Sequence, residues 1–536
     1  MPRYNPNNSL LTAVDNYLNT PAKAGENALD IYHDLTFRTV GAMFADLYAL
    51  TMAQSLWRVG MHEKKVTMQM HIRNNPFNGA YTVSAGQELI VKFLRNWNFA
   101  RRHVDALATL KNPRGDGKLF DPAFLKYIFN AEMDLTVEAL KEGSIFHPYE
   151  ALANVTGPAW QAEMVEGPNL QLMNSSSLLT TAGSHITNAV GGDPWIEGGM
   201  RRAQDFMGLG ATRGAIISGA NSSSNVAAFA IFGTPAGGTM AHFYVMLHKS
   251  EQEAFKNWIT TSPDNSIFLP DTEGDTPRGV ARIIEACKDA GITPIGIRLD
   301  SGDLAYLAKE TRKLLDAAGF YTTMVIASND LNPESILSIK GEMLQFSKDE
   351  GIDAKMNAWL IGTWQVTAKS NPALGGVYKL MSVWEDSDTV RDIIKISGDE
   401  SGIKTTIPGY SRGIRIVGET SGGISQYNAN VIVDGGFDIN QTHLQQDLVS
   451  VDKNAPLNKP QVYSAGTRIH SNYVTLFDTG IQKYELPPLN EIVEHETTEM
   501  AMLDSSYKRW SNPRQFKVGI EQNLFNKRQA MIEARR

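Results

Sequence analysis

The stretch Gly296-Ile297-Arg298-Leu299-Asp300-Ser301-Gly302-Asp303-Leu304 combines a strand-like run with two carboxylates. The apolar, β-branched run from Thr293 to Leu299 ends abruptly in Asp300 and Asp303, with Ser301 and Gly302 between them. This pattern is typical of a buried parallel strand that delivers charged groups to a site at its C-terminal end. Because unpaired charges are too costly for a packed interior, we expect these carboxylates to face a ligand.

Residues around this stretch predict repeated strand–helix units. Strand-like runs end near His242, Asp300, Asn329 and Gly362, and the last three are spaced by about 30 residues, the length of one βα unit. Helical patterns occupy residues 303–318 and 332–350 between these strands. The pattern indicates a barrel-like or doubly wound α/β organisation, with functional loops at the C-terminal ends of the strands.

The composition is that of a globular protein with more than one lobe. The chain has 536 residues, of which 42% are hydrophobic and 20% charged, so it exceeds a single ordinary core. Its formal net charge of −8 argues against a dedicated nucleic-acid binder, and we expect no such partner. No secretory signal and no long apolar run is apparent, which predicts a cytoplasmic protein without membrane contact. The single cysteine, Cys287, is interpreted as a buried structural thiol.

Several short motifs favour a phosphate ligand, and each of them also has a simpler structural explanation. No P-loop, dinucleotide-binding glycine motif or paired zinc-ligand motif occurs, so we expect no metal held by the protein alone. Small or polar residues end apolar runs and adjoin cations, as phosphate-binding loops require, although turns, helix caps and solvated surfaces use the same residue types. These motifs are Arg201-Arg202, Asn221–Asn225, Gly237–His242, Ala327–Asp330, Leu360–Thr363 and Gly375–Lys379. Together with the two carboxylates they suggest a sugar-phosphate ligand carried with a divalent cation, without specifying a reaction.

The order of these motifs resembles the nicotinate phosphoribosyltransferase family over most of the chain. GIRLDSGDLAYL, from Gly296 to Leu307, is similar to that family's most recognisable strand and loop. The other motifs that carry the resemblance are Asp46–Met52, Asn75–Tyr81, Glu142-Gly143, Met200–Gln204, Ser222–Val226, Gly238–His242, Ala327–Leu331, Ile361–Thr363, Pro372–Leu380, Lys404–Gly409 and the ending from Asn512 to Leu524.

The resemblance implies an α/β fold: an irregular, TIM-like α/β barrel plus an α+β lobe built from N- and C-terminal segments. The implied segments are an N-terminal arm at 1–35, the first part of the lobe at 36–157, the barrel core at 158–394, and a strand-rich segment with a C-terminal helix at 395–536. A homodimer with shared active sites is implied as well. The implied reaction joins nicotinate to 5-phosphoribosyl 1-diphosphate, giving nicotinate mononucleotide and diphosphate, with Mg²⁺ carried by the substrates and ATP hydrolysis coupled to the transfer.

The resemblance also implies roles for individual residues. His242 matches the histidine that ATP phosphorylates, Asp300 would hold the ribose hydroxyls, and Arg298 would lie against the pyridine ring. Tyr48 would reach the ring pocket of the neighbouring subunit. Ser224 stands where relatives that use nicotinamide carry an acidic residue, which favours the carboxylate substrate. The remaining implied substrate-binding residues are Arg201, Ser301, Gly302, Ser328, Asn329, Gly362, Thr363 and Lys379.

One departure from the family concerns the ring pocket. The family usually has Phe-Gly before the arginine, and this chain has Gly198-Gly199, so the expected stacking side chain is missing. Loss of offset stacking is worth about 0.5–1.5 kcal/mol, which weakens the binding of a ring without abolishing it. The alternatives are a nicotinamide phosphoribosyltransferase and a catalytically weakened, nucleotide-binding homologue. An unrelated sugar-phosphate aldolase or isomerase would need a lysine or base at a strand end, and no lysine stands at the predicted ends.

Overall fold

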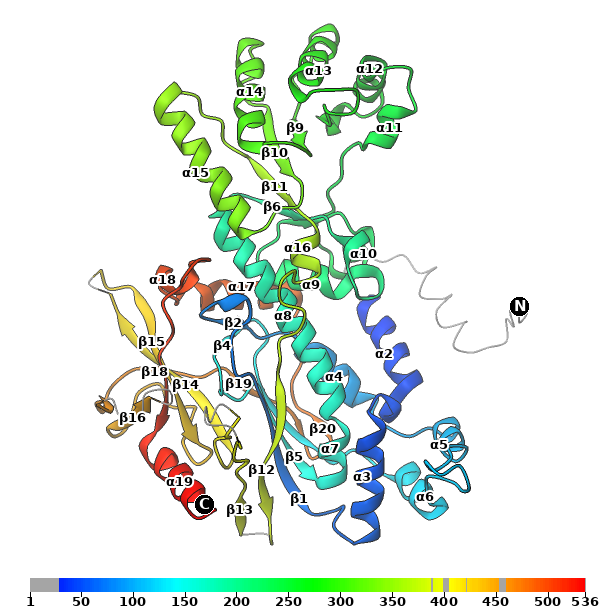
Figure 1. Cartoon of the computed structure of the whole chain (residues 1–536), viewed down its shortest axis with the longest axis vertical. Helices are drawn as coiled ribbons and strands as arrows, with labels where there is room; N and C mark the ends of the chain where they lie inside the picture. The colour runs from blue at the N-terminus through cyan, green and yellow to red at the C-terminus, as the bar shows by residue number, and fades with distance from the viewer. Residues whose placement is uncertain (1–27, 387–388, 399–403, 421, 453–458, 536) are drawn as a thin grey trace.

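A computed structural model describes residues 28–386, 389–398, 404–420, 422–452 and 459–535. Most of the predicted N-terminal arm lies outside these residues, and its last part belongs to helix α2 (Ala28–Val40). The described chain forms three large sheets and one two-stranded sheet. Figure 1 shows an elongated molecule with the first of the sheets described below at the top and the other two beneath it.

The first sheet is parallel and contains the predicted βα units. Its order is β7-β6-β11-β10-β9-β8, and its strands are β6 (Trp195–Glu197), β7 (Ser222–Ser223), β8 (Ile267–Phe268), β9 (Gly296–Leu299), β10 (Met324–Ser328) and β11 (Ala358–Ile361). Helices α13 (Thr276–Ala290), α14 (Leu304–Ala317) and α15 (Pro333–Glu350) connect its later strands. These strands and helices confirm the predicted ends near Asp300, Asn329 and Gly362. In the described residues the sheet has two edges, β7 and β8.

The predicted strand ending at His242 is wrong. His242 begins a short helix, α11 (His242–Met246), and Ala236 makes only an isolated bridge to Ser223 before it. Gly237 and Gly238 interrupt the apolar run at this point, and glycine weakens a strand because it has no side chain to pack. His242 is therefore presented by a loop and the first turn of a helix.

The second sheet is antiparallel and joins distant parts of the chain. Its order is β13-β12-β1-β5-β3-β19-β20, with β1 (Lys65–His71), β3 (Thr136–Leu140), β5 (Ala153–Pro158), β12 (Val377–Trp384), β13 (Val390–Asp392), β19 (Tyr473–Asp478) and β20 (Ile481–Gln482). The three N-terminal strands lie at its centre, and later segments extend both sides. A two-stranded sheet of β2 (Thr82–Val83) and β4 (Ile145–Phe146) lies beside it.

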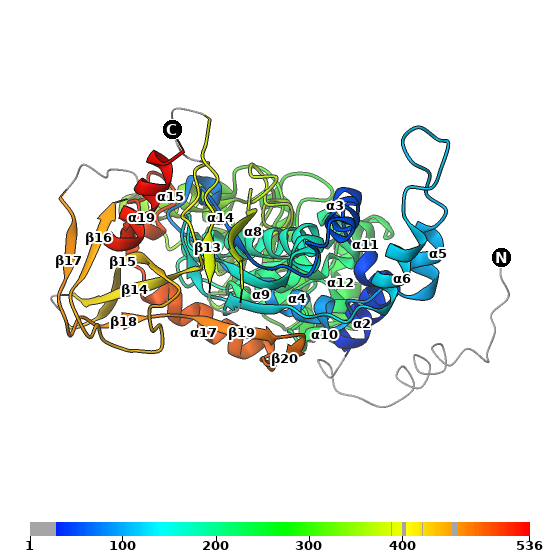
Figure 2. The same cartoon turned by 90° about the horizontal axis from the view of Figure 1, so that it is seen from below.

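The third sheet comes entirely from residues after 410. Its order is β17-β16-β21-β15-β14-β18, with β14 (Ser411–Glu419), β15 (Ser425–Asp434), β16 (Leu448–Asp452), β17 (Gln461–Tyr463), β18 (Ile469–His470) and β21 (Val518–Glu521). Helices α17 (Leu489–Ala501), α18 (Ser505–Lys508) and α19 (Gln522–Glu533) accompany it. Figure 2 shows this sheet on the opposite side of the molecule from α5 (Arg101–Leu107) and α6 (Pro122–Asn130).

The helices between the first two sheets share one core with them. The long helix α8 (Glu166–Val190) contacts α15 beside the parallel sheet and α4 (Gln87–Arg95), β2 and β12 below it. Cys287, on α13, is buried in this core as predicted. The remaining helices are α3 (Leu47–Arg58), α4 (Gln87–Arg95), α5 (Arg101–Leu107), α6 (Pro122–Asn130), α7 (Ala159–Met164), α9 (Leu209–Ile217), α10 (Val226–Phe232), α12 (Glu251–Thr261) and α16 (Thr363–Val366).

A buried ion pair fixes α9 against the N-terminal part of the chain. Both terminal nitrogens of Arg213 donate to Glu142, at 2.6 and 2.9 Å, and one of them lies 2.6 Å from Glu88. Burial alone would raise the pKa of Glu88, but Arg213 and Lys92 lower it to about 2. Glu142 also accepts from the Gly86 amide at 2.7 Å. A buried charge with this many partners is strongly specified, because removal of one partner leaves the others uncompensated.

Candidate active site

The register of the parallel sheet brings the charged residues of the opening stretch to one edge. Arg298 pairs with Ile326 on β10, and Ser328 pairs with Leu360 on β11. Because side chains two residues apart share a face of a strand, Arg298, Asp300, Ser328 and Leu360 lie on the same face. This edge is the C-terminal end of the strands, where ligands bind in open α/β sheets.

His242 lies over this edge and faces two carboxylates. Its Nδ1 is 3.0 Å from the Thr272 hydroxyl. Its Nε2 is 3.7 Å from Asp300 Oδ2 and 3.9 Å from Asp271 Oδ1. The tautomer that donates Nδ1–H to Thr272 leaves Nε2 with a free lone pair, and the side chain is 42% exposed. His242 can therefore act as a nucleophile or proton acceptor toward a bound ligand.

The carboxylates near His242 differ in their partners. The Ser328 hydroxyl donates to Asp300 Oδ1, and the Asp300 side chain is about one-third exposed. The Ser301 hydroxyl donates to Asp271 Oδ2 at 2.7 Å, whereas the buried Asp271 Oδ1 has no hydrogen-bond partner in the described part of the chain. Asp303 instead caps α14 by accepting from the Tyr306 amide at 3.1 Å. Of the two carboxylates in the opening stretch, Asp300 faces the site and Asp303 serves the helix.

Asp271 and Thr272 were not among the predicted site residues. They follow β8, which is only two residues long, so the apolar run before them is too short to stand out. The available signal was Ile267-Phe268-Leu269-Pro270, an apolar segment that ends in a polar pair as the other strands do.

Arg298 is half-buried and only partly hydrogen-bonded. One terminal nitrogen donates to the Thr239 hydroxyl at 2.8 Å, and its Nε has no partner among the described residues. Burial lowers the pKa of Arg298, the Arg201 charge adds to that effect, and Asp300 and Asp271 oppose it. Two cations thus act on the same region, as a site for an anionic ligand requires.

A buried glutamate holds two of the predicted loops in place, and the sequence analysis did not identify it. Glu197, the last residue of β6, accepts from the Gly199 amide and from the hydroxyls of Thr212 and Ser223, the latter two at 2.9 and 2.6 Å. Its carbonyl accepts from the amide of the exposed Ser224 at 2.8 Å. Nothing in the sequence distinguished this glutamate from a surface residue.

The remaining predicted loop residues lie near the same edge. Ser301 and Gly302 form the exposed turn after β9, where Gly302 has a φ of 78°, a conformation that glycine adopts without strain. Asn329 is exposed directly after β10. Gly362 and Thr363 follow β11, with Gly362 preceding the first turn of α16. Asn225 caps α10, so the cap explanation holds for the Asn221–Asn225 motif.

Tyr48 and Lys379 do not join this group within one chain. Figure 1 shows α3, which carries Tyr48, well separated from α11. Tyr48 is 48% exposed, and its hydroxyl bonds to Glu166. The Lys379 charge lowers the pKa values of Glu163 and Glu166. Burial, and to a smaller extent the Glu166 charge, nevertheless raise the pKa of Glu163 to about 7. Tyr48 and Lys379 therefore share a second polar cluster on a different face.

The space beside Gly198 is occupied by an aliphatic side chain. A Cβ placed on Gly198 would lie 2.7 Å from Leu360 Cδ1 and 3.1 Å from Leu360 Cγ. A Cβ on Gly199 would lie 2.4 Å from Val366 Cγ1. The phenylalanine that the family usually carries would therefore require Leu360 to move.

The segments that carry the site residues also expose apolar side chains. Helix α11 exposes Phe243 and Met246, and α10 exposes Val226 and Phe229. The exposed apolar residues of these segments are Met200, Phe206, Val226, Phe229, Phe243, Met246 and Leu247. A monomer rarely exposes so many large apolar side chains around one site.

The described residues contain neither a cluster of metal-ligating side chains nor a membrane-spanning helix. No three His, Cys, Asp or Glu side chains in this part of the chain come together as a protein-held metal site. None of its helices is long and apolar enough to cross a membrane.

Comparison with known proteins gives a consistent result. Residues 43–174 match the nicotinate phosphoribosyltransferase N-terminal domain, and residues 440–528 match the nicotinate phosphoribosyltransferase C-terminal domain. Nicotinate phosphoribosyltransferase from Bacillus subtilis is 32% identical over 504 residues, covering 92% of this chain and 96% of the relative. The Caenorhabditis elegans enzyme of the same name is 28% identical over 552 residues, covering 91% and 92%.

The fold comparison agrees. The crystal structure of human nicotinic acid phosphoribosyltransferase superposes with a TM-score of 0.72 at 24% identity, covering 91% of this chain and 99% of the human chain. The mixed α/β class predicted from the sequence is thereby confirmed. The chain belongs to the nicotinate phosphoribosyltransferase family.

Proposed function

We propose that this protein transfers the 5-phosphoribosyl group of 5-phosphoribosyl 1-diphosphate to nicotinate. The ring nitrogen of nicotinate forms a bond to ribose C1, and the bond from C1 to diphosphate breaks, giving nicotinate mononucleotide and diphosphate. The observation that carries the proposal is the cluster of Asp300, Ser328, His242 and Arg298 at the C-terminal edge of the parallel sheet. The relatives of this chain that carry the name nicotinate phosphoribosyltransferase support it as well.

The geometry supports a division of roles. Asp300, oriented by Ser328 and one-third exposed, can accept hydrogen bonds from the two ribose hydroxyls. Arg298 can offset the nicotinate carboxylate, and Arg201 can contact a phosphate beside it. As the C1–diphosphate bond breaks, negative charge grows on the leaving group, so cations near it lower the barrier.

Magnesium fits this site as a companion of the diphosphate. Asp271, whose Oδ1 has no hydrogen-bond partner among the described residues, and the partly exposed Asp300 would supply hard carboxylate ligands, with substrate oxygens and water completing the shell. When bound, Mg²⁺ would neutralise charge that develops on diphosphate.

We propose that ATP phosphorylates His242. The Nε2 lone pair attacks the γ-phosphorus of ATP, the bond to ADP breaks, and water later releases phosphate from the histidine. His242→Ala should abolish ATP hydrolysis while leaving ATP-independent transfer, and unchanged ATP hydrolysis would refute this role.

We further propose a homodimer in which each parallel sheet acts as an incomplete, TIM-like barrel covered by the partner. Exposed apolar residues around the site and the exposed Tyr48 on another face support this arrangement. Variants Tyr48→Ala and Asp300→Ala, each impaired alone, should recover activity when mixed and refolded, up to about one quarter of wild-type sites for random pairing. No recovery would contradict a shared site.

The experiment that tests the main proposal measures mononucleotide formed from phosphoribosyl diphosphate and Mg²⁺ with nicotinate or nicotinamide, with and without ATP. We expect product from nicotinate and more product with ATP. Product from nicotinamide alone would identify the amide as substrate. Absence of product in every condition would indicate a weakened homologue that binds nucleotides without turnover.

A further inference from the structure

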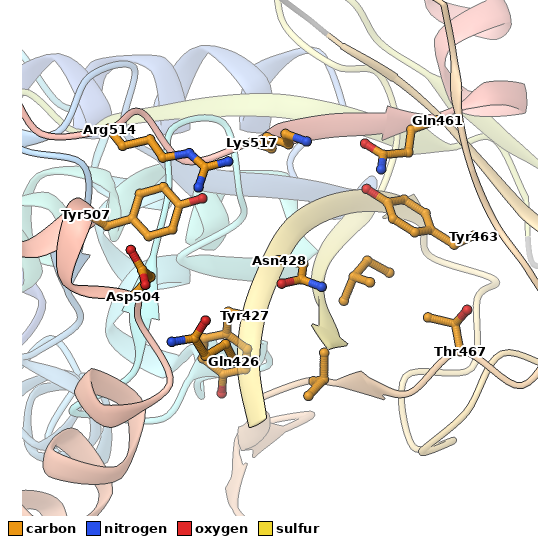
Figure 3. Close-up of a pocket in the computed structure, with 12 residues that line it drawn as sticks. Gln426, Tyr427, Asn428, Gln461, Tyr463, Thr467, Asp504, Tyr507, Arg514 and Lys517 are labelled. Atoms are coloured by element: carbon orange, nitrogen blue, oxygen red, sulfur yellow. The ribbon is translucent and has the colours of Figure 1, made fainter. Parts of the chain in front are cut away.

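A groove on the third sheet lies apart from the catalytic cluster. It consists of three adjoining hollows of about 460, 580 and 210 Å³, and Lys517 lines all three. The first is bounded by β14, β15, β17 and the segment from Asp504 to Lys517 (Figure 3). Figure 1 shows this sheet at the opposite end of the molecule from α11. A ligand in the groove would therefore be separate from one at His242.

The groove carries more positive than negative charge. Four cations line it, and none has an ion-pair partner within the described ranges. They are Arg73, Lys459, Arg514 and Lys517, and the carboxylates of the lining are Asp452 and Asp504. Asp504 is committed to capping α18, where it accepts from the Ser506 amide. The Arg514 charge also acts on Asp504. Since the four cations outnumber the two carboxylates, the lining suits an anionic ligand.

One of the cations is held in place by an aromatic ring. The Arg514 guanidinium lies over the Tyr507 ring, 5.3 Å from its centroid, and the Arg514 amide donates to the Ser506 carbonyl at 3.0 Å. Tyr507 itself is buried. An arginine fixed in this way loses little side-chain freedom when it binds phosphate.

The first hollow also offers surfaces for a flat, polar ring. Figure 3 shows Tyr463 across the hollow from the buried Tyr507, whose ring lies against Arg514. The amide side chain of Gln461 lies beside Tyr463, and that of Asn428 lies between the two tyrosines. Burial raises the pKa of Tyr463 to about 12, so its phenol remains a neutral hydrogen-bond donor. Aromatic faces, amides and cations are the groups that recognise a base and its phosphates.

We propose that this groove binds a nucleotide with two or more phosphates, its base beside Tyr463 and its phosphates at Lys517 and Arg514. The extended shape favours such a ligand over inorganic phosphate, because each of the three hollows that Lys517 lines has one further cation in its lining, Arg514, Arg73 or Lys459. The inference does not depend on the proposed transferase activity, since no residue of the groove belongs to the catalytic cluster.

Hydrogen–deuterium exchange of the full chain with and without ADP tests the proposal, because it locates binding by segment. In the wild type we expect ADP to slow exchange in peptides covering residues 459–467 and 504–518. The variant Arg514→Ala/Lys517→Ala should lose this protection, with an affinity lower by roughly tenfold or more. Lys483→Ala, an exposed lysine outside the groove, is the matched control and should retain it.

Peptides at residues 239–304 report ADP at the catalytic cluster independently. Protection confined to those peptides in the wild type would overturn the proposal, as would protection of the groove that persists in the double variant. If the double variant exchanges faster throughout without ligand, it is destabilised, and the single variant Lys517→Gln is used in its place. Groove protection by ADP that is undiminished in Lys517→Gln would also overturn the proposal.

Discussion

Asp300 and Asp303 stand three residues apart, and their replacement by alanine should have different consequences. Asp300→Ala removes a charged acceptor that, in the proposed function, receives hydrogen bonds from two ribose hydroxyls. Bonds to a charged group are worth about 1.5–3 kcal/mol each, so the loss should reach about 3 kcal/mol or more. This corresponds to a decrease of roughly 100-fold in kcat/KM. Because Asp300 is one-third exposed, its removal should change stability little.

Asp303→Ala removes a helix cap. The lost bond, from the Tyr306 amide to Asp303 Oδ1, is 3.1 Å long and lies on the exposed start of α14. Substitution of a capping aspartate costs about 1 kcal/mol, which should lower the thermal midpoint of a chain this size by a degree or two. Turnover should remain within about twofold of the wild type, because the side chain faces its helix.

The measurement is kcat/KM for phosphoribosyl diphosphate together with a thermal unfolding curve for each variant. Asp300→Asn serves as a control that keeps the shape and removes the charge. Equal losses of activity in Asp300→Ala and Asp303→Ala would show that the assignment of the two carboxylates is mistaken. A loss of stability in Asp300→Ala that accounts for its lost activity would refute the proposed contact with ribose.

Three further predictions follow from buried or hydrogen-bonded groups. Arg213→Ala should destabilise the protein by about 3–5 kcal/mol, because the buried Glu142 loses its counter-ion and Glu88 keeps only Lys92, and an unchanged denaturation midpoint would argue against a buried pair. Burial and Glu499 raise the pKa of Glu496 to about 8. The folded state then retains a proton that the unfolded state releases above 4.5, so stability should fall as pH rises from 4.5 to 8. Glu496→Gln should flatten this slope in thermal unfolding, and an identical slope would contradict the shift. Thr272→Val removes the Nδ1 partner of His242 and should lower ATP hydrolysis about tenfold while sparing ATP-independent transfer; equal losses of both would contradict a positioning role.

Local sequence patterns were sufficient for the regular parts of the parallel sheet. The strands ending near Asp300, Asn329 and Gly362 were predicted because each is a short apolar run followed by a small or polar turn. The helices after the first two begin at capping residues, Asp303 and Asn332. The information for these elements lies within about 30 residues, the span of one βα unit.

Contacts between distant segments could not be predicted in the same way. Glu197 was missed because its partners, Thr212 and Ser223, come from other elements and nothing in the local pattern distinguishes a buried glutamate. Asp271 was missed because β8 is too short to produce a periodic signal. The loop at His242 was assigned to a strand because composition alone does not show that two glycines interrupt pairing.

The close approach of Leu360 to Gly198 could not be predicted from the sequence either. The absence of the usual phenylalanine was apparent, but the reason required the structure, in which Leu360 fills the adjacent space. A phenylalanine at 198 would need the space that Leu360 fills, so Leu360 would have to move to accommodate it.

The order of strands in the antiparallel sheet has a consequence for synthesis on the ribosome. Strands β1, β3 and β5 emerge first, but the outer side of β1 pairs only with β12 and the outer side of β3 only with β19. Ribosomes add about 5–20 residues per second, so the more than 300 residues between β5 and the end of β19 require at least about 15 seconds. During that interval the nascent chain presents unpaired, largely apolar strand edges, which are templates for aggregation. We therefore expect this protein to depend on chaperones during translation more than its compact final core would suggest.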